Sequence, residues 1–163
     1  MKPLLRTTTA TAGLLACWLT AQPALGQVAV LNTWSNTGTG NWTDTANWSL
    51  GAVPSTAESD LAVINNGGTA QISSAVAQQP GGVILGQANA QSGTLNIQSG
   101  GSLTVIKDPG FEATTGIVSV GQATTGRGTL TIERGGSLAA LGLNSGGDAA
   151  SLITLGIVRF SRA

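Results

Sequence analysis

The sequence predicts an all-β fold, a β-solenoid of the parallel β-helix kind built from repeats of about 35 residues. First, the stretch GTLNIQSGGSLTV at 93–105 returns as GTLTIERGGSLAA at 128–140. Second, apolar residues alternate with polar ones inside each copy, the period of a strand with one buried face. Third, only 9% of the residues are charged, which suits stacked, uncharged polar rows. An antiparallel sandwich or barrel is the alternative, because strand–Gly-Gly–strand also describes a hairpin.

Residues 1–26 have the pattern of a secretory signal peptide. Lys2 and Arg6 supply a positive end, residues 12–21 are mostly apolar, and Ala24-Leu25-Gly26 offers small residues for cleavage before Gln27. We therefore expect export and a mature chain without a membrane span. A loose lipobox around Cys17 leaves a lipoprotein as a variant of this prediction.

Residues 27–60 form a tryptophan-rich segment of different character. Trp34, Trp42 and Trp48 lie among Asn, Thr and Gly residues, with Asp44 between the last two. We expect these aromatic residues to cover the apolar end of the first coil, because terminal units of repeat arrays are atypical. The alternative is a sugar-binding platform, in which the indoles stack on pyranose rings and Asp44 bonds to hydroxyl groups.

Residues 61–163 contain the repeats. In the best-defined copy the predicted buried side comprises Leu95, Ile97, Leu103 and Val105, and Gly100-Gly101 forms a corner. A degenerate earlier copy at 61–72 has Gly67-Gly68 in the place of that glycine pair. A third copy begins at Gly156 and is truncated, and the residues per coil remain open between one wide coil and two narrow ones.

The residue inventory gives little support to catalysis. The chain has no histidine, and its only cysteine lies in the predicted signal peptide, which excludes His-dependent triads, thiol nucleophiles and Cys/His zinc sites from the mature chain. We predict no catalytic residue, no metal site and no cofactor; Lys107–Gly110, near Glu112, is expected to be a turn. Seven basic and seven acidic residues cancel, so nucleic acid is not an expected partner.

The pattern W…GxGxWxxxxNWxxGxVP, followed by GTLxIxxGGSL repeats, resembles the passenger regions of bacterial autotransporter-type surface proteins and the large secreted repeat proteins of planctomycetes. This resemblance covers roughly residues 33–156 and implies a secreted β-helix displayed at the cell surface. It departs from those proteins in showing no translocation barrel or sorting tail, which leaves open whether the chain is part of a longer protein. A barrel downstream would imply association with the outer membrane.

From these features we expect a structural or adhesive surface module without enzymatic activity. A carbohydrate-binding module using the tryptophan-rich segment is the alternative, and a polysaccharide-degrading β-helix fragment is less favoured. Extracellular glycans or cell-surface components are the expected partners, together with self-association through the open edge of the last coil.

Overall fold

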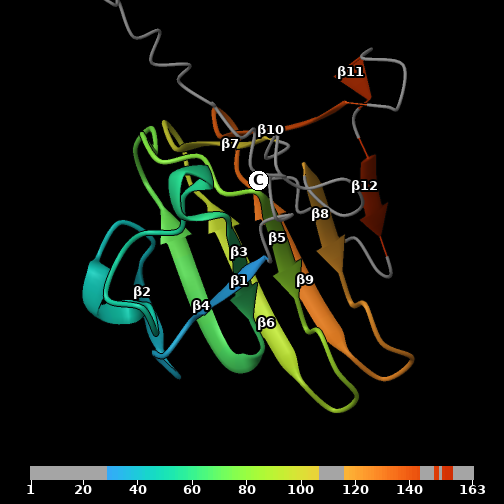
Figure 1. Cartoon of the computed structure of the whole chain (residues 1–163). Coiled ribbons are helices and arrows are strands. Elements are labelled where there is room, and N and C mark those ends of the chain that lie inside the picture. Colours follow the sequence, from blue (N-terminus) through green and yellow to red (C-terminus); the bar gives the residue numbers. More distant parts are fainter. Residues whose placement is uncertain (1–28, 107–115, 144–148, 151, 156–163) are drawn as a thin grey trace, which may run out of the picture.

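The computed structural model describes residues 29–106, 116–143, 149–150 and 152–155, and within them the chain is all-β (Figure 1). The predicted signal peptide and the predicted turn at Lys107–Gly110 lie outside these residues. In the described part, helical structure is confined to two short 3-10 turns, η1 (Thr45–Asn47) and η2 (Thr56–Glu58).

The strands form three sheets, and the chain visits these sheets in turn. A five-stranded sheet has the order β1 (Val30–Thr33), β3 (Asp60–Ile64), β5 (Gly82–Leu85), β8 (Ile117–Val120) and β12 (Leu152–Leu155). A four-stranded sheet has the order β2 (Thr39–Asn41), β4 (Asn66–Ile72), β6 (Ser92–Ile97) and β9 (Arg127–Ile132). A three-stranded sheet contains β7 (Ser102–Ile106), β10 (Ser137–Leu143) and the short β11 (Ala149–Ala150).

The pairing of these strands repeats the sequence register. Gly82 pairs with Ile117, Leu95 with Leu130, and each partner lies 35 residues further along the chain. The third sheet keeps the same offset between β7 and β10. Each repeat therefore passes once through all three sheets.

Almost all of the described pairing is parallel, which is not the arrangement of an antiparallel sandwich or of hairpins across the glycine pairs. The exceptions among the described residues are the pairing of β10 with β11 and an isolated antiparallel bridge between Trp34 and Trp48. In Figure 1 the strands β4, β6 and β9 run side by side, with β7 and β10 at their upper end.

The expected alignment of Gly67-Gly68 with Gly100-Gly101 is wrong. These glycines lie in β4, and the residues after them pair with β6, Ala70 with Leu95 and Ile72 with Ile97. Gly68 therefore lies just before the continuous run of β4 residues that pairs with β6, in the place that Gly93 has in β6. The alignment fails because only one residue separates β3 from β4, so this earlier turn is shorter than a full repeat.

The glycine corner predicted at Gly100-Gly101 is confirmed. The backbone amide of Gly101 donates to the carbonyl oxygen of Gln98 at 2.9 Å, and Gly100 has φ +81°. A positive φ at the third residue defines a type II turn, which a residue with a Cβ adopts only at a cost. The next copy repeats this turn with Gly135 at φ +87°.

The predicted buried side of the repeat is also confirmed. Leu95, Ile97 and Val105 are 0% exposed and Leu103 is 1% exposed. These residues belong to one apolar core, which extends from β8 and β9 to the three tryptophans of the N-terminal segment. The sheets therefore share a continuous interior, to which each of the strands from β3 to β10 contributes buried residues.

Candidate functional site

The three tryptophans of the N-terminal segment pack against one another in the interior. Trp34, Trp42 and Trp48 are 1%, 0% and 3% exposed. The ring of Trp48 meets both others edge to face, with centroids 5.0 Å from Trp34 and 4.8 Å from Trp42. Its indole N–H donates to the carbonyl oxygen of Trp42 at 2.7 Å. Such pairing is a favourable aromatic geometry, which fixes the three rings as one unit.

The tryptophan-rich segment lies at one end of two sheets. Strands β1 and β2 are the first strands of the five-stranded and four-stranded sheets. Residues beyond β2 return along the outer edge of this end: the amide of Ser49 donates to Thr33 O and the amide of Ser35 donates to Asn47 O, each at 2.8 Å. Backbone groups that a further strand would otherwise pair with are thus bonded within the segment.

The structure brings the three predicted platform tryptophans together but leaves Asp44 apart from them. Asp44 is exposed, and its carboxylate accepts from the amide of Ala46 at 3.1 Å, as the N-cap of η1. In this conformation the indole faces are turned into the core and are not available to a sugar ring. The glycan platform stays a prediction, and the observed burial does not favour it.

Sequence reasoning missed a buried polar pair beside this segment. Asn32 and Asp60 are 0% and 1% exposed. The side-chain amide of Asn32 donates to Asp60 Oδ2 at 3.2 Å and to the carbonyl oxygen of Ala52 at 2.9 Å. The amide of Ser55 approaches the same carboxylate oxygen at 3.4 Å. Asp60 therefore joins β3 to β1 and to the segment that precedes η2.

The other carboxylate oxygen of Asp60 is buried and has no hydrogen-bond partner among the described residues. Burial raises the pKa of Asp60 above its ordinary value, with a smaller contribution from the negative charge of Glu58, while the bonds from Asn32 and Ser55 oppose the shift. A signal for this site existed in the sequence. Asp60 precedes Ala62 by two residues in β3, so the two side chains lie on the same face of this strand, all five residues of which are buried.

The outer face of the four-stranded sheet carries two rows of uncharged polar side chains. The strand register places each of these residues beside its equivalent in the next strand, about 4.8 Å away. One row is Thr39, Thr69, Thr94 and Thr129, and the second is Asn41, Gln71, Asn96 and Thr131. All eight side chains are exposed or half-buried. This face therefore carries the stacked, uncharged polar rows that the low charge content suggests.

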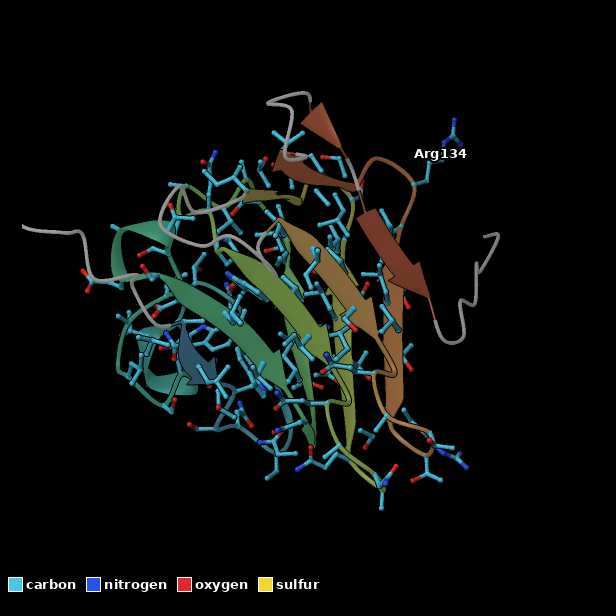
Figure 2. All side chains as sticks on the ribbon, turned by 45° about the vertical axis from the view of Figure 1, so that its right-hand side comes forward. Arg134 is labelled. Carbon is cyan, nitrogen blue, oxygen red and sulfur yellow. The ribbon has the colours of Figure 1, made fainter. Side chains whose placement is uncertain are left out.

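Charge enters this face at the turn after β9. Glu133 is exposed, yet it reaches back one repeat, accepting from the side-chain amide of Asn96 at 3.3 Å and the backbone amide of Ser99 at 3.4 Å. Figure 2 shows Arg134 pointing away from the sheets into solvent. Both residues are exposed, and Glu133 additionally links successive copies.

No protein-family model, curated protein or solved structure matches this chain. None of the helical turns in the described residues is long and apolar enough to cross a membrane. Within the same residues, no group of three or more His, Cys, Asp or Glu side chains is placed to hold a metal ion.

Proposed function

We propose that the chain is a β-solenoid module of an exported or cell-surface protein, with a structural or adhesive role and no catalytic activity. The observation that carries this proposal is the 35-residue register, which recurs between β5 and β8, β6 and β9, and β7 and β10. Successive copies stack their apolar residues into one core, as the coils of a solenoid do. A stack of this kind is a spacer whose length grows with the number of repeats.

Within this proposal, residues 27–60 are the cap of the stack and residues 61–163 its repeats. The buried tryptophans and the bonded outer edge of β1 support the cap, because an uncovered first coil would expose both core and strand edge. Residues 1–26 are the signal peptide that directs export. Mass spectrometry of the chain recovered outside the cell is expected to find Gln27 as its first residue. A full-length chain retained inside the cell would contradict export.

The adhesive contact is assigned to the threonine and amide rows on the four-stranded sheet. Uncharged hydroxyl and amide groups at regular spacing complement extracellular glycans or uncharged cell-surface components, since they donate and accept hydrogen bonds without a fixed charge. The spacing follows from the strand pairing and does not depend on mobile loops.

A surface-adhesion assay tests this assignment. Beads coated with the chain are expected to attach to the cells or cell-wall material of the source, and the double variant Thr94→Lys, Thr129→Lys should reduce attachment. Thr104→Lys is the matched control, because Thr104 lies on β7 in a different sheet and is also half-buried. Equal attachment by all three proteins would reject this face as the contact, and no attachment by the parent chain would reject adhesion.

The C-terminal end of the stack is the proposed site of self-association. β9 is the last strand of the four-stranded sheet among the described residues. Ile132 is 39% exposed, whereas Ile97, its partner in the preceding copy, is 0% exposed. An apolar side chain beside an unpaired edge favours association with another chain.

A further inference from the structure

Three segments of the N-terminal end meet at one buried carboxyl group. Asn32 comes from β1, Ser55 comes from the chain between η1 and η2, and both bond to Asp60 Oδ2 at the start of β3. Asn32 is held in turn by the carbonyl oxygen of Ala52 and by the amide of Leu50, which donates to its Oδ1 at 3.3 Å. Asp60 thus adds a buried side-chain contact that helps to fasten the cap, residues 27–60, to the stack, beside the parallel pairing of β1 with β3 and of β2 with β4.

No cation compensates this carboxyl group in the described structure. Arg127 and Arg134 are the basic residues in the described ranges, and they lie in β9 and the turn after it. In the four-stranded sheet, β4 and β6 lie between β9 and β2, the strand at the N-terminal end. The titratable group that acts on Asp60 is Glu58, which has the same sign of charge. Burying a carboxylate without a partner cation costs much more than burying the neutral acid.

We propose that Asp60 is a proton-operated latch, which holds the cap closed when its carboxyl group is neutral and loosens the cap when that group ionises. The bonds from Asn32 and Ser55 can be accepted by either form, so protonation does not remove them. Ionisation instead draws water towards the unpartnered Oδ1, and the buried position of Asp60 opposes that hydration. The latch adds a response to pH, independently of whether the module is adhesive.

The direction of the response follows from the linkage between proton binding and folding. The pKa of Asp60 is raised above its ordinary value of 3.8. At a pH between the unfolded and folded values, the folded state therefore binds more protons than the unfolded one. The stabilising contribution is fully present below the unfolded pKa and is lost as the pH rises through the folded pKa. The cap is accordingly tighter in acid than at neutral pH.

The tryptophan cluster supplies a local reporter. Trp34 comes directly after β1, two residues beyond Asn32, and Trp48 precedes Leu50 by two, so both rings are attached to segments that the latch holds. Acrylamide, a neutral quencher, reports the access of solvent to these rings. A Trp18→Phe background leaves Trp34, Trp42 and Trp48 as the emitting residues.

The experiment measures acrylamide quenching of the full chain between about pH 3 and pH 8. The quenching constant is expected to rise with pH, and Asp60→Asn should abolish the rise and keep the low value throughout. Asp44→Asn is the matched control, because this exposed residue caps η1 and asparagine preserves that cap. The quenching constant of this variant should depend on pH as that of the parent does. Glu58→Gln should move the midpoint to lower pH, since Glu58 raises the pKa of Asp60.

A quenching constant that is independent of pH, or that falls as pH rises, would overturn the latch, and this result needs only the parent chain. A titration that persists in Asp60→Asn would assign it to another group and would also overturn it. Calcium added at neutral pH is expected to have no effect; restored protection would identify a cation site instead. Far-UV circular dichroism in parallel distinguishes loosening of the cap from loss of the sheets on which the proposed function depends.

Discussion

The indole N–H of Trp48 donates to the carbonyl oxygen of Trp42 at 2.7 Å, while the ring of Trp48 stands edge-on to that of Trp34. This relationship converts three aromatic residues from one short segment into the buried end of the core. The burial of these rings favours the cap over the sugar platform, because a ring packed in this way is not presented to a ligand.

Trp48→Ala is expected to destabilise the chain by about 3–5 kcal/mol, since it leaves a large cavity and removes the bond to Trp42. Chemical denaturation of the parent and the variant measures this difference. Leu50→Ala is the control: Leu50 is 51% exposed, and its truncation should change stability by less than about 0.5 kcal/mol.

The same variants, screened on glycan arrays, decide whether the segment binds sugar. We expect Trp42→Ala and Trp48→Ala to lower the stability of the fold rather than to remove a contact with a glycan. Specific glycan binding by the parent chain, lost in a variant that keeps the parent's stability, would establish the carbohydrate platform in place of the cap.

Alternation in β6 predicts opposite behaviour for neighbouring residues. Leu95 is 0% exposed and Thr94 is half-buried on the outer face, so Leu95→Ala should cost about 2–5 kcal/mol and Thr94→Ala less than about 0.5 kcal/mol. Thermal and denaturant unfolding of the two variants checks this. Similar losses at both positions would mean that the strand is not one-sided.

Gly100, the corner glycine with positive φ, predicts a backbone effect without a steric one. An added Cβ at Gly100 meets no atom closer than the carbonyl oxygen of Ser73 at 3.8 Å, so Gly100→Ala should cost about 1–2 kcal/mol through its positive φ alone. Asparagine tolerates this conformation better, and Gly100→Asn should recover part of the loss. A neutral Gly100→Ala in denaturant unfolding would show that the type II turn is not formed.

The exposed Ile132 on β9, the last strand of its sheet among the described residues, predicts self-association that a single charge can prevent. Ile132→Lys should lower the apparent mass of the chain in sedimentation velocity, because it places a charge on the exposed apolar edge of β9. Leu50→Lys introduces the same charge at the capped end on a residue that is also exposed, and it should leave association unchanged. Equal effects of the two substitutions would locate the association elsewhere.

The repeat could be predicted because the sequence contains two nearly identical copies of it, at 93–105 and 128–140. Alternation located Leu95 and Leu103 on the inner face, and the glycine pair located the corner, since both depend on local geometry. The alignment of Gly67-Gly68 failed because short connections change the offset between copies, and because glycine is also needed away from corners. Gly93 lies within β6, where an added Cβ would collide with the carbonyl oxygen of Ile64.

The candidate site was less accessible to sequence reasoning. Trp34, Trp42 and Trp48 were recognised as a group, but their burial depends on how residues 45–49 return along β1, which no local pattern encodes. Asp44 appeared to share their site because it is close in sequence, yet it caps a 3-10 turn. Asn32 and Asp60 were missed since 28 residues separate them.

A disulfide cross-link tests most directly the claim that one repeat is one turn of a parallel stack. In a Cys17→Ser background, Thr94→Cys and Thr129→Cys face each other across the pairing of β6 with β9, about 4.8 Å apart, which is within the range for a disulfide. Mild oxidation should join them within one chain. Thr94→Cys with Thr104→Cys should not react, because these residues lie in different sheets. Cross-linking of the second pair and not the first would mean that β6 folds back on β7 as a hairpin, and it would contradict the stack.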